Sequence, residues 1–495
     1  MPTAKKPSDR NASAAKTPAT RKPKSASAAS AASAASAASA APAASAASAA
    51  TIAAAAKATR KAPAKAPAPA VRVKKDRIAI VGGLRSPFTR AWSTLNDVDP
   101  IELSTQVARE VMFRWELAPE LLDHVVWGTV ISIVRAPNVA REVALNLGLY
   151  NVPGFTVSRA CASGLQSIAS ASDMITLGHG EIALAGGVDV TSHAPVTYKK
   201  RVIDQLLKAQ KAKGMALVHT IAGIHPMDLL PAAPALTERY TGKTMGEHAE
   251  EMAQNLHIDR KDQEALAIKS HASASAAIDK GLIGDDVITV QTPKGPVRED
   301  NLVRRDMDAD KLAKLRPVFD RKHGTITAAT SSPLTDGAAC VLLMKESRAK
   351  ELGYEPLGYL RSYHVAALDP RENMLLGNVY SLPGALDRAG VKLADLDVLE
   401  LHEAFAAQVL ANARLFDDKA FFADKLGRSE TLGPVDWSKV NIWGGSMAYG
   451  HPFAATGGRL VINLLRALAH VDGELGAVTT CAAGGIGASM VFERS

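Results

Sequence analysis

Two stretches of the chain repeat the same alternation of strand-like and helix-like patterns, and this repetition limits the possible folds more than any other feature. In the first stretch, the apolar run RIAIVGG follows Asp76, and the run EIALAGGVDV ends at Val190. In the second, GYLRSYHVAAL begins at Gly358, and GAVTTCAAGG leads into ASMVFE near the end of the chain. Short apolar runs bounded by glycines are typical of buried strands. Two successive β/α units, each with a cysteine after a strand, predict a duplicated α/β architecture.

The segment between the two repeats, residues 195–334, has an irregular pattern with basic and Met-containing stretches. We interpret it as an insertion that covers the active site. The expected organisation therefore has four parts. They are a tail at 1–75, a first half formed by 76–194 and 335–355, the insertion at 195–334, and a second half at 356–495.

Residues 1–75 differ in composition from the remainder of the chain. They consist mainly of Ala, Ser, Lys and Pro, with repeated AAS triplets, and they contain no aromatic residue. Such a segment cannot build a core that offsets its chain entropy, so we expect a disordered tail. The tail carries a net charge of +13, whereas the rest of the chain carries −5. Two other interpretations stay open: a tether for nucleic acid or another polyanion, and a transit peptide, which would place the protein in mitochondria.

The absence of long apolar runs and the cysteine count both bear on the cellular location of the protein. No run approaches the roughly 18 consecutive apolar residues of a membrane-spanning helix, so no transmembrane segment is predicted. Three cysteines do not form an even disulfide framework, which favours free thiols in a reducing compartment such as the bacterial cytoplasm. Cys340 lies in the apolar run DGAACVLLM and is expected in the core.

The first candidate for chemistry is Cys161, in VSRACASGLQS. Small residues after it would let a helix start close to a strand, and the positive end of a helix dipole lowers the pKa of a thiol. A buried, inert cysteine is the alternative interpretation. His451 lies between Gly450 and Pro452, ahead of a segment with an amphipathic helical pattern. A histidine in that turn could act as the base for a thiol, although a single histidine in a turn is more often structural.

Two further candidates are Cys481 and His402. Cys481 precedes AAGGIG, in which glycines allow backbone N–H groups to approach a ligand and form an oxyanion hole. A second thiol near the first could carry a proton to and from a carbanion when a carbon–carbon bond is made or broken. His402, followed by Glu403, lies at the end of a predicted strand in LHEAFAAQ.

These four motifs resemble those of the thiolase family, in the same order and at the same spacing. The likeness extends over nearly all of residues 76–495, with further matching stretches such as PNVAREVALNLGL, KLRPVFDRKHGTITAA and YGHPFAATGGRL. It is closest to the 3-ketoacyl-CoA thiolases, the β subunits of the bacterial fatty-acid-oxidation complex, which are similar to the β subunit of the mitochondrial trifunctional protein. The tail at 1–75 has no counterpart in the family.

The resemblance implies a fold and a set of partners. It implies two βαβαβαββ halves in a layered α-β-α-β-α arrangement, with an inserted loop domain that covers CoA. It also implies an acyltransferase that works as a homodimer, possible association with a hydratase/3-hydroxyacyl-CoA dehydrogenase α subunit, CoA as co-substrate, and no permanently bound cofactor or metal.

The resemblance also implies a role for each motif residue. Cys161 would be the acylated nucleophile, His451 the base that activates it, and Cys481 the general acid/base. Backbone N–H groups of Cys161 and Ala483 would hold the tetrahedral oxyanion, and His402 with His451 would stabilise the enolate oxygen. Many thiolases have Asn at the position of His402, and Gly is common where this chain has Ala482 and Ala483.

Contacts to CoA are implied for Met245, Ser332 and Phe405, which match positions along the pantetheine channel. A basic stretch lies in the insertion, formed by Lys199, Lys200, Arg201, Lys208, Lys211 and Lys213. It could be a solvated helix face, could steer the CoA phosphates, or could touch a membrane or partner.

The implied reaction is the cleavage of a 3-ketoacyl-CoA by CoA into acetyl-CoA and a shortened acyl-CoA, in fatty-acid β-oxidation. A biosynthetic acetoacetyl-CoA thiolase shares both cysteines and is the alternative. A ketoacyl synthase would use one cysteine with two histidines, or with His and Asn, so Cys481 argues against that class.

Overall fold

The computed structural model describes residues 76–230 and 237–495. The predictions made for the tail at 1–75 fall outside the described residues.

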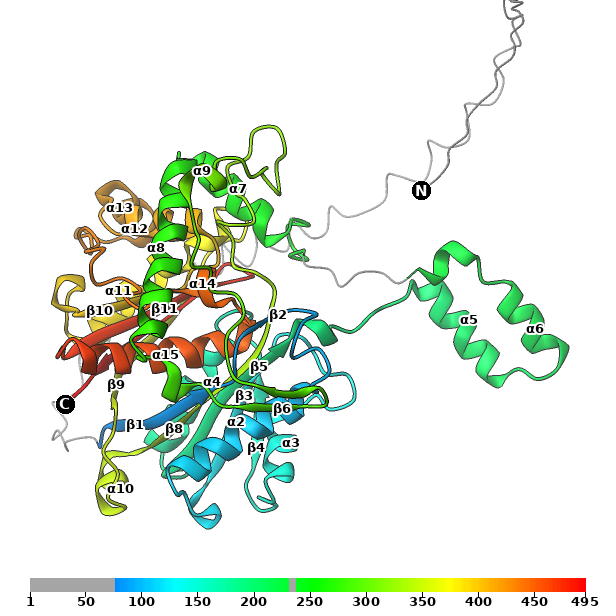
Figure 1. Ribbon diagram of the computed structural model, residues 1–495, viewed down its shortest axis with the longest axis horizontal. Helices are drawn as coiled ribbons and strands as arrows, with labels where there is room; N and C mark the ends of the chain where they lie inside the picture. Colours follow the sequence, from blue (N-terminus) through cyan, green and yellow to red (C-terminus); the bar gives the residue numbers. More distant parts are fainter. Residues whose placement is uncertain (1–75, 231–236) are drawn as a thin grey trace, which may run out of the picture. The chain divides into compact units, whose positions relative to one another are not determined.

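The strands of both halves form one mixed sheet (Figure 1). Its order is β10-β11-β12-β9-β1-β8-β5-β3-β4, with the short β2 (Thr89–Arg90) paired to β8. Pairing of β1 with β9 joins the two halves. The other bounds are β1 Ile78–Arg85, β3 His124–Gly128, β4 Gly154–Val157, β5 Ile182–Val190, β8 Thr335–Lys345, β9 Gly358–Ala367, β10 Val398–Leu401, β11 Leu475–Ala482 and β12 Ile486–Glu493.

The two halves repeat one strand order, which confirms the predicted duplication. In the first half β3 and β5 are parallel, while β5–β8 and β8–β1 are antiparallel. In the second half β10 and β11 are parallel, while β11–β12 and β12–β9 are antiparallel. Where the first half adds β4, the second has only a parallel bridge between Leu399 and Val440.

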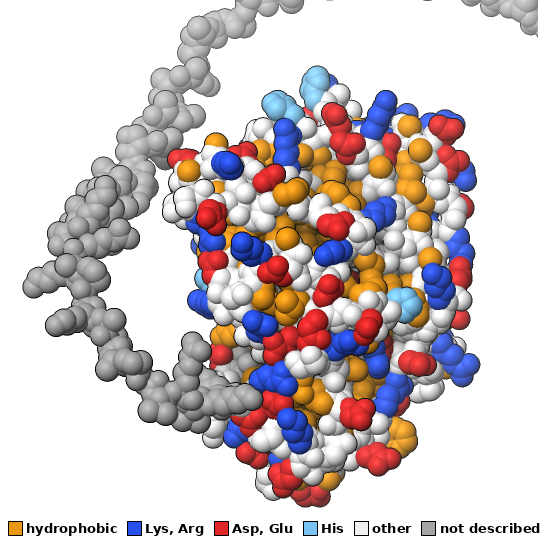
Figure 2. All heavy atoms as spheres, turned by 90° about the vertical axis from the view of Figure 1, so that its left-hand side faces the viewer, with side chains coloured by type: hydrophobic (Ala, Val, Ile, Leu, Met, Phe, Trp, Pro, Cys, Tyr) orange, Lys and Arg blue, Asp and Glu red, His pale blue; other side chains and the backbone are white. Residues whose placement is uncertain are grey.

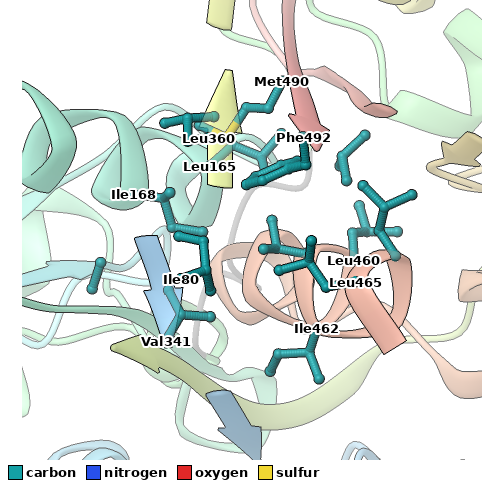
Figure 3. Close-up of a cluster of buried hydrophobic side chains, with 14 of the residues drawn as sticks. Ile80, Leu165, Ile168, Val341, Leu360, Leu460, Ile462, Leu465, Met490 and Phe492 are labelled. Atoms are coloured by element: carbon teal, nitrogen blue, oxygen red, sulfur yellow. The ribbon is translucent and has the colours of Figure 1, made fainter. Parts of the chain in front are cut away.

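Two central helices, α4 (Ser163–Thr176) and α15 (Phe453–His470), pack against each other and against strands of both halves. Their apolar side chains share one core with side chains from β1, β8, β9 and β12 (Figure 3). That figure labels Leu165 and Ile168 of α4, Leu460, Ile462 and Leu465 of α15, and Ile80, Val341, Leu360, Met490 and Phe492 of the strands.

Two further cores lie against the other faces of the sheet. One contains apolar residues of α2 (Pro100–Arg114) and α3 (Val139–Asn146) with strands of the first half. The other contains residues of α11 (Gly377–Ala389) and α12 (Ala406–Leu415) with strands of the second half. The strands of the two halves thus pack against the central helices α4 and α15, with α2 and α3 on the outer face of the first half and α11 and α12 on that of the second. This arrangement is the layered thiolase-like fold, so the predicted fold class is confirmed.

The two central helices approach each other at glycines. A Cβ added to Gly164 of α4 would lie 2.3 Å from the carbonyl oxygen of Ala454 in α15, and one added to Gly457 would lie 2.5 Å from the amide nitrogen of Leu165. The backbones of α4 and α15 are therefore in direct contact at these glycines. Because α4 follows Cys161 and α15 follows His451, this contact sets the distance between the two motifs.

The insertion is more regular than its sequence pattern indicated. It contains α5 (Lys200–Lys211), α6 (Met215–Ala222), α7 (Met245–Asn255), α8 (Arg260–Asp279), β6 (Val290–Thr292), β7 (Gly295–Val297) and α9 (Ala309–Leu312). A capping box formed by Thr244 and Glu247 starts α7. The run SHASASAA fills α8 with small residues, which hides the apolar periodicity of a helix. The proposed domain boundaries stay predictions.

The surface of the described residues carries charges of both signs, interspersed over the face in Figure 2. This mixture agrees with the small net charge of the chain beyond the tail. Among the described residues, no helix combines the length and apolar character that crossing a membrane requires. Cys340 is fully buried in β8, as expected of a core residue.

Candidate active site

One cavity of about 310 Å³ brings the predicted site residues together. Its lining includes Cys161, His451, Cys481 and Ala483 from the two halves, and Met245, Ser332 and Phe405 from the CoA-channel prediction. Part of this wall, including Met245, Phe319 and Ser332, belongs to the insertion at 195–334. His402 lies just behind the lining: its ring centroid is 4.2 Å from that of His451, with the two rings tilted by 50°.

Cys161 lies in a tight turn two residues before α4 begins at Ser163. Ala160 has a positive φ of 45°, and the Ser163 hydroxyl donates to its carbonyl oxygen at 2.7 Å. Burial raises the pKa of the Cys161 thiol to about 11; a hydrogen bond from the Ala483 N–H opposes this rise, and the Asp189 carboxylate adds to it. The predicted effect of the helix dipole is therefore outweighed by burial. At rest the group is a neutral thiol, which needs a base.

His451 can supply that base. Its backbone N–H donates to the Thr335 hydroxyl at 3.0 Å, and its Nδ1 is 2.7 Å from the Thr456 hydroxyl. Its Nε2 is buried and has no hydrogen-bond partner among the described residues. Burial, helped by the positive charge of Arg459, lowers the pKa of His451 to about 3. A neutral imidazole with an open nitrogen can accept a proton from a thiol.

His402 follows β10 and donates its backbone N–H to the carbonyl oxygen of Thr479 at 3.0 Å. Its Nδ1 is 3.0 Å from the Ser446 hydroxyl, at the start of α14 (Ser446–Tyr449). Within the described part of the chain, its buried Nε2 has no partner. Burial, and then the neighbouring His451 and Arg459, hold the pKa of His402 well below its usual value. This second imidazole is therefore neutral as well.

Cys481 occupies a different position from Cys161. It lies inside β11, paired with Gly487 of β12, and it is not in the turn after the strand. The expectation of a cysteine after a strand in each half is therefore wrong for the second half. Cys481 is buried, which raises the pKa of its thiol, and the nearby Cys161 raises it further. The following turn, at Ala483, is made possible by two glycines with positive φ, Gly484 and Gly485.

Asp189, at the end of β5, is a residue that the sequence patterns did not single out. Its Oδ1 accepts from the backbone N–H groups of Val130 and Ile131, at 2.9 and 2.7 Å, and its Oδ2 accepts from the Ala454 N–H at 2.8 Å. Burial raises its pKa to about 7, while these N–H groups favour the carboxylate. Asp189 thereby ties a loop of the first half to the first turn of α15, next to His451. In the sequence, the one indication of this role is that Asp189 is a single acidic residue near the end of an apolar strand.

Glu403 plays a similar part on the other side of the site. It accepts from the Ser270 hydroxyl and the Asn441 amide, each at 2.7 Å, and from the Met447 N–H at 3.2 Å. These bonds connect α8, the end of β10 and α14. They hold in place the segment that carries Ser446 and leads to His451.

Two family models match the chain: that of the thiolase N-terminal domain over residues 78–347, and that of the thiolase C-terminal domain over residues 354–494. The chain belongs to the thiolase family. Among curated thiolases, it is 47% identical over 431 residues to the 3-ketoacyl-CoA thiolase of Yersinia enterocolitica, a match covering 86% of this chain and 99% of that protein. It is 46% identical over 422 residues to the 3-ketoacyl-CoA thiolase of Erwinia tasmaniensis, covering 84% of this chain and 97% of that one.

Two solved thiolase-fold structures match as well. Human mitochondrial 3-ketoacyl-CoA thiolase superposes with a TM-score of 0.73 at 29% identity, and the acetyl-CoA acetyltransferase of Bacillus anthracis with 0.72 at 31%. Each match covers 85% of this chain and 99% of the other. The family resemblance read from the four motifs is thus confirmed.

Proposed function

We propose that this thiolase is a degradative 3-ketoacyl-CoA thiolase, which cleaves a 3-ketoacyl-CoA with CoA to acetyl-CoA and a shortened acyl-CoA. The observation that carries the proposal is one cavity lined by two thiols and the neutral imidazole of His451, with the neutral imidazole of His402 directly behind it; neither Nε2 atom has a partner among the described residues. The names of the relatives at 46–47% identity support the substrate class.

The first half of the reaction forms an acyl-enzyme. The Cys161 thiol gives its proton to His451 Nε2, and the thiolate attacks the 3-keto carbon. Backbone N–H groups of Cys161 and Ala483 hold the resulting oxyanion; a hydrogen bond from the Ala483 N–H to the resting thiol supports this placement. The bond between C2 and C3 then breaks, and its electron pair passes into the enolate of acetyl-CoA. His402 and His451 donate to the enolate oxygen while Cys481 protonates C2.

The second half releases the product. Free CoA gives its thiol proton to the Cys481 thiolate and attacks the carbonyl carbon of the acyl-Cys161 thioester. Acyl-CoA leaves, and Cys161 recovers its proton from His451. The covalent intermediate divides one difficult step into two easier ones, so ping-pong kinetics are expected.

The cavity wall is suited to a long, flexible thioester. Met245, Phe319 and Phe405 give it apolar contact surface, and Ser332 adds a hydroxyl, as expected of a pantetheine channel. A second cavity of about 260 Å³ shares Ser331 and Pro333 with the first. Its lining includes three basic residues, Arg90, Arg304 and Lys311, along with Asp306 and Asp308. The three cations outnumber the two carboxylates and would attract the CoA phosphates.

Chain-length profiling of thiolysis tests the substrate class. We expect turnover of medium- and long-chain 3-ketoacyl-CoA; activity confined to the four-carbon substrate would instead identify an acetoacetyl-CoA thiolase. Radiolabelled acyl-CoA should leave a thioester-bound label on the enzyme that is lost in Cys161→Ser and kept in Cys340→Ser, a matched change of a core cysteine. Label kept in Cys161→Ser would refute the nucleophile assignment.

The proposal extends to the assembly. A cytoplasmic homodimer, able to associate with a hydratase/3-hydroxyacyl-CoA dehydrogenase subunit, suits this activity, and bacterial relatives support the compartment. Sedimentation of the purified chain alone and with such a subunit tests both parts; a monomer at all concentrations would contradict them.

A further inference from the structure

A buried ion pair lies behind the two histidines of the site. Arg459 of α15 and Glu400 of β10 are both fully buried, and Arg459 Nη1 is 3.8 Å from Glu400 Oε2. A buried cation is costly unless an anion compensates it. Glu400 supplies that anion only in part, because burial raises the pKa of its carboxyl to about 8. Neither of its oxygens accepts a hydrogen bond from a described residue, so the guanidinium remains free to donate elsewhere.

Arg459 donates instead to a hydroxyl that touches His402. Its Nη2 is 3.0 Å from the Ser446 Oγ, and the same oxygen is 3.0 Å from His402 Nδ1. A guanidinium has donors and no acceptor, so Ser446 must accept this bond. The hydroxyl has a second lone pair, but accepting from His402 as well would leave its own proton buried without a partner among the described residues, which is costly. The hydroxyl proton of Ser446 is therefore placed on the remaining neighbour, His402 Nδ1. That nitrogen is the acceptor, and a neutral imidazole that accepts at Nδ1 carries its proton on Nε2.

The open side of His402 is where a donor is needed. Its Nε2 has no partner among the described residues, and its ring lies beside that of His451, which lines the cavity. Burial, and then the neighbouring His451 and Arg459, lower the pKa of His402, so the ring keeps this single proton instead of becoming a cation. The hydroxyl that accepts from Arg459 therefore favours a His402 ring with one N–H, placed at Nε2.

We propose that Arg459 is a positioning residue that, through Ser446, fixes His402 as the neutral Nε2–H tautomer, a preset donor to the developing enolate oxygen of the thioester. The identity of the acceptor rests on the proposed function, whereas the tautomer depends only on the geometry of the free enzyme. Supporting residues of this kind orient a catalytic ring without touching the substrate.

The tautomer can be read directly by NMR. In enzyme labelled with ¹⁵N-histidine and free of substrate, the His402 signals, assigned by their loss in His402→Asn, should show the proton on Nε2. In Ser446→Ala the Nδ1 partner is lost, and we expect a shift toward a mixture of tautomers. The value of kcat should fall roughly 10- to 100-fold with KM little changed, since the donor is misplaced only in the transition state.

The role of Arg459 is tested in a variant that also replaces Glu400, because removing Arg459 alone would leave Glu400 buried without its partner and destabilise the fold. The double variant Arg459→Met/Glu400→Leu eliminates both buried charges and should change the His402 signals as Ser446→Ala does. Arg466→Met is the matched control: Arg466 lies on the same helix and pairs with Asp286, away from the histidines, so the tautomer should be unchanged.

Three results would decide the matter. A proton on Nδ1 in the parent enzyme would overturn the proposal, as would an unchanged Nε2–H signal and kcat in both the Ser446 and Arg459 variants. An Nε2–H signal in a parent enzyme that lacks thiolysis would refute the proposed function and still support the tautomer assignment.

Discussion

The glycine contact between the two central helices makes the sharpest test of how the site is assembled. Replacing Gly164 by Ala would place a methyl group 2.3 Å from the Ala454 carbonyl oxygen and 3.1 Å from backbone atoms of Gly457. Ordinary contact begins near 3.4 Å, so the helices must separate by about 1 Å. No side chain can rotate out of the way, because the opposing atoms belong to the backbone.

The expected effect is large for so small a change. Overpacking of a tight contact costs about 1–3 kcal/mol of stability. A displacement of about 1 Å between reacting groups can lower the rate by about 100-fold. Since α4 begins two residues after Cys161 and α15 begins two residues after His451, the added methyl group should separate thiol and base. We expect kcat to fall about 100-fold while the protein still folds.

Steady-state thiolysis and thermal unfolding measure the two effects. Gly284→Ala is the matched control, because its added Cβ would meet no atom within 4 Å, and both quantities should stay near those of the parent. If Gly164→Ala keeps kcat within about twofold and its Tm unchanged, the contact does not set the distance between Cys161 and His451.

Three other predictions concern charge and the tail. Burial raises the pKa of Cys161 to about 11, and the thiolate is the reactive form, so alkylation by iodoacetamide should accelerate with pH well beyond neutrality; a plateau below about pH 8 would contradict this. Asp189→Asn turns an amide N–H₂ toward backbone donors and should cost about 1–3 kcal/mol of stability together with a fall in kcat, measured by denaturant unfolding and thiolysis; parent-like values for both would refute the anchoring role of Asp189. Removal of residues 1–75 should leave turnover intact while retention on DNA falls, and equal loss of both would show that the tail is not separable from the enzyme.

The motif residues could be predicted because their chemistry is local in the sequence. Cys161, His451, Cys481 and His402 each occur in a short, distinctive segment, and the structure brings them together as expected. Their supports could not be found in the same way. Asp189 bonds to Ala454, 265 positions away, and no local pattern records such a partner.

The pKa values of the site residues were the other property that could not be predicted from the sequence. The position of Cys161 ahead of a helix was predicted correctly, yet the pKa of its thiol moves in the opposite direction from that expected. Burial by the insertion and by the second half decides it, and burial is a property of the assembled fold. The small residues of α8 concealed a helix for a related reason, since its packing depends on neighbours distant in the sequence.

The shared core around α4 and α15 has a consequence for how this fold can be divided. Each central helix packs against strands of both halves, so a half made alone would leave its most apolar helix facing water. Repeat arrays gain stability unit by unit, but here neither half can bury its central helix without the other. The two halves must fold together, and a shorter chain carrying only one of them would have to pair with a second copy of itself.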